Sequence, residues 1–464
     1  MKSVFFVMLA SVVIFSGCKT LKPEPGTLLS LKIPDRFSVD AGDNDSIVTW
    51  WFLFESDELT SLINHAVDHN FDLKILKTKV IQAKANLEKE EASFFPELGF
   101  SFGGQKKETR VKNTYSSPSD YDGSHSWDGS LRGAYNLDVW GQANAGKQVE
   151  ILSLKAAEQD LKFSTLELTA QIAENWIDII AARHKKSILG NQIKINNTLL
   201  ELQTLRFVNG KANALDVSQQ REVLAEANSQ LPLLEKQEKL LLNNLAFLSG
   251  KTDLKPVEMT TKILPDPLPL PKVGIPSDLL ENRPDIQAAG MRLSSGQWEI
   301  TAARADRLPS FDLTAQALFS SGKLDLLFNN WVATLAGSIA GPILDGGLRK
   351  AEIKRLKAVA DEQLTLYART VAKAIVEVED SLVSIDKQAA YIRLLEEELA
   401  VARLTLKDAG VQYQNGQSSY LAYLTAWTHI EQLERKLVGE RAALIKERIG
   451  LYRALGWNPI PGTT

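Results

Sequence analysis

The residues of this 464-residue chain that could perform acid–base, metal or nucleophilic chemistry form no recognisable active site. His65 and His69 lie four residues apart in a predicted helix, where two imidazoles can share a metal ion, but no third ligand is evident and the glutamate of a zinc hydrolase motif is missing. The segment Ser249-Gly250-Lys251-Thr252 is similar to the end of a phosphate-binding loop, yet Leu245 stands where the first glycine is required. We interpret the histidine pair as part of a solvated helix face and the Ser249–Thr252 segment as a glycine-capped helix end. We therefore expect no catalysis, no metal and no nucleotide.

The single cysteine, Cys18, follows a pattern typical of exported proteins. An apolar stretch from Val4 to Phe15 is too short to span a bilayer as a helix and suits the core of a signal peptide. Phe15-Ser16-Gly17-Cys18 resembles the lipobox of bacterial lipoproteins, in which the cysteine becomes the lipidated first residue. Lys19 is not the aspartate that commonly retains lipoproteins in the inner membrane. We expect a signal peptide over 1–17 and a covalent lipid on Cys18 as the only attached group. A plain secretory signal with an incidental cysteine is the alternative.

Composition excludes some classes of protein. The formal net charge is -4 with acids and bases interspersed, so the chain lacks the basic footprint of a nucleic-acid-binding protein. Apolar residues make up 44%, which is enough to bury a core. No other window reaches about 18 apolar residues, so we expect no transmembrane helix. An exported chain of this kind is periplasmic, surface-anchored or a β-barrel.

An internal repeat organises the chain into two copies of one unit, at about 50–254 and 277–457. Phe207-Val208-Asn209-Gly210 recurs as Tyr413-Gln414-Asn415-Gly416, and the same offset pairs Gly250 with Gly456. A lipid-anchored segment over 18–49 precedes the copies, and a short tail over 458–464 follows them. The linker over 255–276 is rich in proline, and we expect it to run extended over the surface.

Each copy is dominated by a very long helical pattern. From Ile353 to Ile392 apolar residues recur at steps of three and four, without proline or glycine until Gly410. A comparable stretch lies between Gly141 and Arg206. About 65 residues at about 1.5 Å each give a rod of about 100 Å. Each rod is expected to end near an Asn-Gly pair and to be followed by a returning helix of about 38 residues. Such hairpins are coiled-coil rods.

Four segments alternate with a period of two and are predicted to be strands, at about 97–105, 126–139, 310–319 and 331–344. Strands of about ten residues cross a bilayer when tilted. An ordinary half-buried antiparallel sheet alternates in the same way and is the alternative.

The number of strands bears on the assembly. A transmembrane barrel needs about eight strands or more. Lipid does not tolerate an open sheet edge, so several chains must share one barrel, with the rods continuing it as a helical tube. The polar strand face then lines a water-filled pore. We expect this lining to contain Asp128, Ser130, Arg132, Asn136, Asp312, Thr314 and Gln316.

The order of several motifs resembles the TolC family of outer-membrane efflux channels, and more closely its NodT-type lipoprotein branch of multidrug and metal efflux factors. These motifs span about 50–457 and include Trp50-Trp51, Tyr135-Asn136-Leu137-Asp138-Val139-Trp140-Gly141, Leu215-Asp216-Val217, Arg283-Pro284-Asp285-Ile286, Pro342-Ile343-Leu344-Asp345-Gly346-Gly347 and Leu451-Tyr452-Arg453-Ala454-Leu455-Gly456-Trp457. The resemblance implies a mainly α-helical homotrimer. Each chain would give four strands to a twelve-stranded transmembrane barrel and its helices to a periplasmic α-barrel.

The same resemblance implies a function and a place in the cell. The protein would be a lipid-anchored duct in the bacterial outer membrane that extends into the periplasm. It would passively conduct small molecules delivered by a periplasmic adaptor and an inner-membrane efflux transporter. A periplasm-spanning structural lipoprotein without a pore is the alternative, since it also explains the anchor and the rods.

The resemblance places a gate at the two Asn-Gly reversals, where polar bonds between helices hold the periplasmic tip shut. Asp216 and Tyr413 match two residues that take part in such bonds. Ser418 stands in the place of a basic partner, and Ala422 and Thr425 in the place of acidic rings. The adaptor would dock on Val208, Asn209, Gly210, Gln414, Asn415 and Gly416. Asn-Gly pairs reverse a chain without any partner, so plain turn chemistry is the alternative for all of these residues.

Overall fold

The computed structural model describes residues 20–24, 32–38, 49–111, 120–251 and 259–456, so the lipid expected at Cys18 lies outside the described residues. The chain divides into two compact units. The first unit comprises Met1–Leu29, Val80–Ala157 and Ala289–Tyr367, and the second comprises Ser30–Lys79, Glu158–Ala288 and Ala368–Thr464. Each unit therefore combines parts of both sequence copies.

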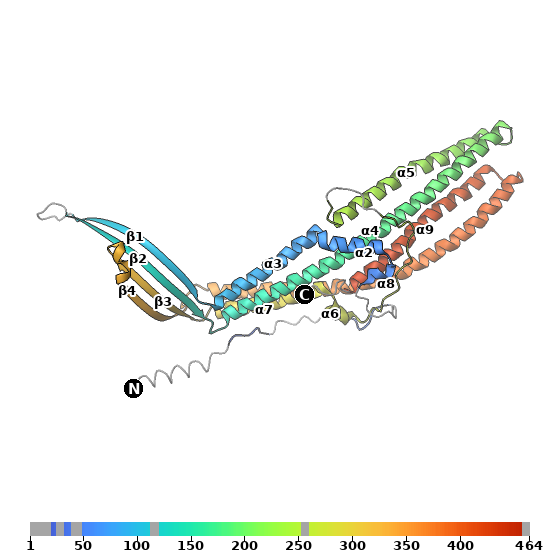
Figure 1. Ribbon diagram of the computed structural model, residues 1–464. Coiled ribbons are helices and arrows are strands. Elements are labelled where there is room, and N and C mark those ends of the chain that lie inside the picture. Colours follow the sequence, from blue (N-terminus) through green and yellow to red (C-terminus); the bar gives the residue numbers. More distant parts are fainter. Residues whose placement is uncertain (1–19, 25–31, 39–48, 112–119, 252–258, 457–464) are drawn as a thin grey trace. The chain divides into compact units, whose positions relative to one another are not determined.

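The first unit contains an antiparallel sheet with the strand order β1-β2-β3-β4 (Figure 1). The strands are β1 Glu97–Val111, β2 Asp120–Leu137, β3 Ser310–Ser321 and β4 Trp331–Ala340, with the short helix η4 Leu324–Asn329 between β3 and β4. All four predicted strands are present. β1 and β2 are longer than predicted because they stay paired as far as Val111 and Asp120. β4 ends earlier than predicted, just before Gly341 and Pro342, because proline has no N–H to donate to a ladder.

A repeated Leu-Asp motif connects the sheet to the long helices. Both carboxylate oxygens of Asp138 accept from main-chain amides at the start of α4 (Gln142–Val208), at 3.0 and 2.9 Å. In the second copy Asp345 accepts from the amides of Gly347 and Arg349, at 2.9 and 3.3 Å, where α8 (Leu348–Gln414) begins. These amide bonds hold the pKa of Asp345 below its usual range. The motif thus satisfies the free amides that every helix has at its start.

A shorter helix precedes each pair of strands in the chain. α3 (Phe71–Glu91) leads through η2 (Ala92–Phe94) into β1, and α7 (Pro284–Ala305) precedes β3. Each copy therefore has the order short helix, strand pair, long helix and returning helix.

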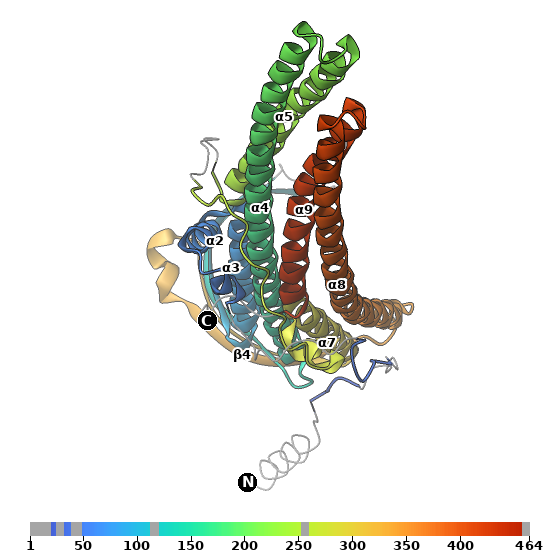
Figure 2. The same cartoon turned by 90° about the vertical axis from the view of Figure 1, so that its right-hand side faces the viewer.

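The second unit contains two antiparallel helical hairpins (Figure 2). α4 and α8 have 67 residues each, and their returning helices α5 (Ala214–Leu248) and α9 (Tyr420–Ala454) have 35. Both reversals use a glycine in the left-handed region, Gly210 at φ 69° and Gly416 at φ 71°. The predicted rods and Asn-Gly reversals are confirmed. No helix among the described residues is long and apolar enough to cross a membrane.

The largest apolar core lies at the base of these hairpins. There η1 (Trp50–Phe54) and α2 (Asp57–His69) pack against α4 and α9. Trp50 is fully buried and stacks on Tyr452 with ring centroids 6.1 Å apart, while Phe54 meets Trp176 edge-on at 5.9 Å. The Trp-Trp motif therefore serves packing.

The proline-rich linker, described from Met259 onward, is extended. Several of its residues are exposed, among them Lys262, Ile263 and Asp266, but Met259 and Leu268 are buried in the apolar core. Leu268 is 1% exposed. Tyr452 donates to the carbonyl oxygen of Pro269 at 3.0 Å, and Arg448 donates to that of Leu268. An extended proline-rich segment has carbonyls that no helix or sheet satisfies, so these two side-chain donors allow the part around Leu268 to be buried. The short helices η3 (Pro276–Asp278) and α6 (Leu279–Asn282) follow it.

Candidate functional site

The sheet has an apolar face that continues across all four strands. Phe100, Leu131, Ala317 and Ala333 are consecutive partners in the strand register. The neighbouring rows are also apolar and contain Leu98 with Leu335, and Phe102 with Phe319 and Trp331. Most of the large side chains are exposed in the single chain, with Phe100 85% and Leu335 83% exposed, while Phe319 is half-buried. A continuous exposed apolar surface of this kind marks a contact with membrane or with a partner.

The opposite face of the sheet is largely polar. Asn136 donates from Nδ2 to Asp312 Oδ1 at 2.9 Å, and the hydroxyls of Ser101 and Ser130 bond to each other at 2.9 Å. The pairing places the predicted lining residues of β2 and β3 on this one face, because Arg132 opposes Gln316 and each strand alternates. They are Asp128, Ser130, Arg132, Asn136, Asp312, Thr314 and Gln316.

The sheet also has two free edges. Among the described residues β1 pairs only with β2, and β4 pairs only with β3. Each outer strand therefore has one row of main-chain donors and acceptors that no strand of the same chain satisfies. Such an edge is a template for pairing with another chain.

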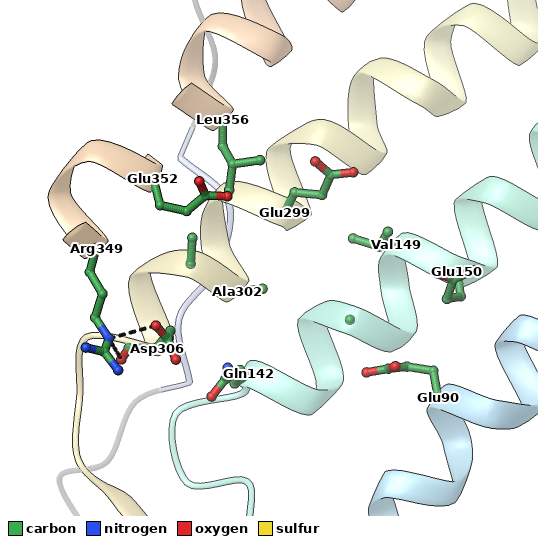
Figure 3. A pocket seen from close by; sticks show the side chains of 12 residues that line it. Glu90, Gln142, Val149, Glu150, Glu299, Ala302, Asp306, Arg349, Glu352 and Leu356 are labelled. Atoms are coloured by element: carbon green, nitrogen blue, oxygen red, sulfur yellow. Dashed lines mark hydrogen bonds and ion pairs between the residues drawn. The ribbon is translucent and has the colours of Figure 1, made fainter. Parts of the chain in front are cut away.

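A cleft of about 390 Å³ lies among the helix ends next to the sheet (Figure 3). Carboxylates from four helices line it: Glu90 of α3, Glu150 of α4, Glu299 of α7 and Glu352 of α8. Burial, and then the charges of Glu90 and Glu299, raise the pKa of Glu150. At its rim Arg349 donates to Asp306 at 2.8 Å. The cleft wall is therefore acidic, and its charge is partly offset by Arg349 and by Arg355, which pairs with Glu352 at 2.7 Å.

At the hairpin tips, the two predicted gate residues bond to different partners. Asp216 accepts from the amide of Asn213 at 3.2 Å and donates its own amide to Asn213 Oδ1 at 2.8 Å, which forms a capping box for α5. Tyr413 donates to Gln203 Oε1 at 3.2 Å and so links α8 to α4. The guanidinium of Arg206 lies 4.7 Å from the centroid of the Tyr413 ring. Tyr413 therefore joins the two hairpins, whereas Asp216 holds the start of its own helix.

The remaining predicted tip residues are exposed or half-buried. Ser418 is half-buried, Ala422 and Thr425 are exposed, and the Thr425 hydroxyl donates to Leu421 O at 2.8 Å. The reversals themselves close by amide-to-carbonyl bonds, from Lys211 to Arg206 and from Gln417 to Gln412, which is the pattern of a Schellman helix end. The predicted docking residues are all exposed: Val208, Asn209, Gly210, Gln414, Asn415 and Gly416.

Sequence reasoning missed a set of buried polar residues between the hairpins. This buried polar layer consists of Gln192, Asn196 and Gln203 on α4, Gln220 on α5, and Tyr420 and Glu431 on α9, each at most 6% exposed. A signal was present: Gln192, Asn196 and Gln203 follow Leu189 at steps of three, four and seven, so amides occupy the apolar stripe of a long helix.

The two histidines of α2 lie side by side. Their rings stack with centroids 4.2 Å apart, and His69 donates from Nδ1 to the carbonyl oxygen of His65 at 2.9 Å. In the described part of the chain, no group of three or more histidine, cysteine, aspartate or glutamate residues is arranged to hold a metal ion.

A chain that combines a sheet with one exposed apolar face and one polar face and two long paired helical hairpins has the features of an outer-membrane channel protein. The model of the family described as outer membrane efflux protein matches residues 62–251 and 275–457. The chain belongs to this family. Its fold class and its role as an outer-membrane efflux channel, both predicted from the sequence, are confirmed. The family is one of efflux proteins, not of enzymes.

Individual relatives agree along nearly the whole chain. The pyoverdine export outer membrane protein OpmQ of Pseudomonas aeruginosa is 30% identical over 419 residues, covering 89% of this chain and 88% of OpmQ. Nodulation protein T of Rhizobium leguminosarum bv. trifolii is 26% identical, with 93% of each chain covered. A crystal structure of CusC superposes with a TM-score of 0.85 at 23% identity, covering 94% of this chain and 99% of CusC.

Proposed function

We propose that three copies of this chain form the passive exit duct of a tripartite efflux pump, held in the outer membrane by the barrel and by a lipid on Cys18. The observation that carries this proposal is the two-faced sheet with two free edges. In lipid each unsatisfied main-chain group costs several kcal/mol, so an open four-stranded sheet is not stable there. Pairing β1 of one copy with β4 of the next removes every edge and leaves the polar face around a water-filled lumen.

The helices offer matching surfaces for neighbouring copies. On α5 the apolar residues Leu233, Leu240 and Phe247, spaced seven apart, are each more than half exposed. On α8 a second exposed stripe contains Val376, Val383, Leu394 and Val401. Seven-residue spacing presents apolar side chains to a partner helix in a coiled coil. We propose that α5 of one copy packs against α8 of the next, which closes the helical tube below the barrel.

The exposed reversals at the tips are where we place a periplasmic adaptor, through which the duct meets an inner-membrane transporter. The duct supplies no chemistry or energy of its own. The names of the relatives range from pyoverdine export to nodulation. We therefore propose that the transporter, not the duct, selects the small molecule that is exported.

Conductance tests the duct. Purified protein is expected to have the mass of a trimer and to form discrete conducting channels in planar bilayers. Protein that inserts but never conducts, even after loosening of the tips, supports a pore-free scaffold instead.

The contact between copies is tested by oligomeric state. Leu240→Glu is expected to reduce the trimer fraction because it places a charge in the apolar stripe of α5. Gln237→Glu adds the same charge at an exposed polar position of the same helix and is expected to leave the trimer intact.

Lipidation is tested separately. Cys18→Ser is expected to abolish labelling with radioactive palmitate, because this cysteine is the only one in the chain. Labelling that persists in the variant would place the lipid elsewhere.

A further inference from the structure

The connections between paired strands differ in the two copies of the repeat. In the first copy β1 and β2 stay paired beyond the end of β3, as far as Val111 and Asp120 (Figure 1). In the second copy β3 ends at Ser321, and the chain forms the short helix η4 before β4 begins at Trp331. No described residue of the first copy forms an equivalent of η4, so strand pairing by itself does not require this helix.

The helix η4 is folded back onto the apolar face of the sheet. Leu327 is 2% exposed, and its Cδ2 lies 3.8 Å from the position that a Cβ would take at Gly129. Phe102, the strand partner of Gly129, reaches the same position at 3.9 Å, so Leu327 lies on the face that presents Phe102. Phe328 meets Phe319 of that face edge-on, with ring centroids 5.4 Å apart. Both contacts fix η4 to the apolar face rather than to the polar one.

The same helix also exposes large apolar side chains. Leu324 is 52%, Leu326 41% and Phe328 74% exposed. Contact of such side chains with water is unfavourable in proportion to their area, and the connections between strands are as a rule polar. Because these three side chains continue the exposed apolar face of the sheet, they indicate a contact with an apolar partner.

Aromatic side chains mark the part of the apolar face at which η4 lies. Phe102 stacks on Trp127 with ring centroids 6.0 Å apart, and Trp331 is the strand partner of Phe319. These four residues, here called the aromatic girdle, lie in the part of the sheet remote from the starts of α4 and α8. Aromatic residues gather at the membrane–water interfaces of outer-membrane barrels. The girdle therefore places η4 at the outer interface.

The apolar face of the strands is short for a bilayer. From Phe311 to Phe319, at about 3.4 Å per residue and a tilt of about 45°, β3 covers about 19 Å of membrane thickness. The apolar band of a bacterial barrel is about 25 Å tall, so about 6 Å is missing. Beyond the girdle the same face of β1 is polar, since Lys106 and Glu108 form an ion pair there at 2.7 Å.

The position of η4 corresponds to this missing height. A Cβ at Gly322, just before η4, would lie 3.5 Å from the carbonyl oxygen of His125, which is farther out along β2 than the girdle. Leu327, near the other end of η4, lies at the level of Gly129. The chain thus enters η4 outside the girdle and returns to it, and the first residues of the helix add apolar surface beyond that of the strands.

We propose that η4 is a membrane-interface helix whose partner is the lipid of the outer leaflet. Leu324, Leu326 and Phe328 contact acyl chains close to the headgroups and extend the apolar band outward, while Leu327 fastens the helix to the sheet. The partner is lipid rather than a second copy, because η4 lies over β2 and β3 whereas neighbouring copies meet at the edges of β1 and β4. The inference rests on the proposed function, which places the barrel in the outer membrane.

Fluorescent labels test the position of η4. Leu324→Cys and Phe328→Cys, each carrying an environment-sensitive NBD label, are placed in phosphatidylcholine vesicles that contain nitroxide lipids, labelled either near the headgroup or deep in the acyl chain. We expect blue-shifted emission and about twofold stronger quenching by the shallow nitroxide than by the deep one, as for side chains at an interface. Unsubstituted protein, whose only cysteine is Cys18, gives the background.

Two control sites bracket the result. Leu335→Cys lies in the middle of the apolar face and should be quenched more by the deep nitroxide. Ser124→Cys lies on the exposed part of the β1–β2 hairpin beyond β3 and should emit as in water. If the Leu335 label is quenched by neither lipid, the barrel is not in the membrane and the proposed function itself fails.

Other outcomes concern η4 alone. If the Leu335 label is quenched as expected while the two η4 labels emit like the Ser124 label, the helix lies in water and the inference is wrong. Blue-shifted η4 labels that neither nitroxide lipid quenches would show that protein, such as a second copy, covers the helix. That result also overturns the inference.

A second measurement tests the added height. The double variant Leu324→Ser with Phe328→Ser should fold into thin dilauroyl phosphatidylcholine vesicles as well as the unsubstituted protein does. In thicker dioleoyl phosphatidylcholine vesicles its folded-to-unfolded ratio should fall about fivefold, because a shortened apolar band mismatches the bilayer. Leu335→Ser weakens the middle of the band without shortening it and should lower the ratio equally in both lipids. A double variant that behaves like Leu335→Ser refutes a role of η4 in extending the band.

Discussion

The guanidinium of Arg283 donates from Nη1 to the carbonyl oxygen of Ala454 at 2.9 Å, so the residue before α7 satisfies the end of α9. The first copy repeats this relationship with a different side chain: Asn70, just before α3, donates from Nδ2 to Leu248 O at the end of α5 at 2.8 Å. Each copy thus closes its returning helix with the residue that begins its short helix.

Arg283→Ala is expected to destabilise the protein strongly. The side chain is 4% exposed and also binds Asp285, at 2.8 and 3.0 Å, and Glu377 at 2.8 Å. Removing one partner of a buried ion pair costs about 3–5 kcal/mol because the partner left behind keeps an uncompensated charge. Here that partner is Asp285, since Glu377 also pairs with Lys373 at 3.3 Å. Arg355→Ala removes an exposed pair with Glu352 and should change the urea midpoint little. Equal midpoints for the two variants would contradict this account.

Alanine substitutions at two glycines should distinguish the cost of backbone strain from the cost of a steric clash. Gly416 and Gly456 have similar positive φ angles, 71° and 76°. A Cβ at Gly416 meets nothing within 4 Å, whereas one at Gly456 would lie 2.9 Å from the Asn282 carbonyl oxygen. Gly416→Ala should cost about 1 kcal/mol, the usual penalty for alanine in this region. Gly456→Ala should cost clearly more in the same unfolding experiment, and a smaller loss there would show that the α9 end is free to shift.

Opposite faces of β2 should respond differently to the same charge. Leu131→Arg places a cation on the lipid face, where it costs about 2–4 kcal/mol at mid-bilayer, so folding into liposomes should be impaired. Ser130→Arg places it on the polar face and should allow assembly while shifting the reversal potential toward anion selectivity. Equal folding yields for the two variants would undermine the assigned facing.

Glu431 should make stability depend on pH. Burial raises the pKa of its carboxyl, against the opposing effects of the Asn196 bond and Arg435. A carboxyl with a raised folded-state pKa contributes stability below its ordinary pKa, and that contribution is lost as the pH rises through the folded-state pKa. Glu431→Gln keeps an oxygen for Asn196 but has no proton to lose. Its melting temperature should therefore exceed that of the unsubstituted protein at neutral pH, with the difference vanishing near pH 4, about the ordinary glutamate pKa. Parallel curves for the two proteins would be inconsistent with a buried, titrating Glu431.

Local patterns in the sequence were sufficient to predict the elements and their facing. Alternation around Leu131 and Ser130 predicted which side chains share a face of the sheet, because a strand turns successive residues to opposite sides whatever it pairs with. The Asn-Gly pairs at Gly210 and Gly416 predicted the reversals, because the left-handed conformation depends on the residue itself. The sheet partners of β2 and the extent of β1 could not be predicted from local patterns, since pairing involves residues far apart in the chain.

Only the tertiary structure decided which groups are buried together. The sequence suggested that Asp216 and Tyr413 share a role, yet one caps its own helix and the other bonds to Gln203. Asn196 and Glu431 have the residue types of a solvated face, and Leu268 lies in a linker that composition alone places on the surface. Helical periodicity records which residues share a face, but the neighbour that covers that face is determined by contacts between helices some two hundred residues apart in the chain, such as that between Asn196 and Glu431.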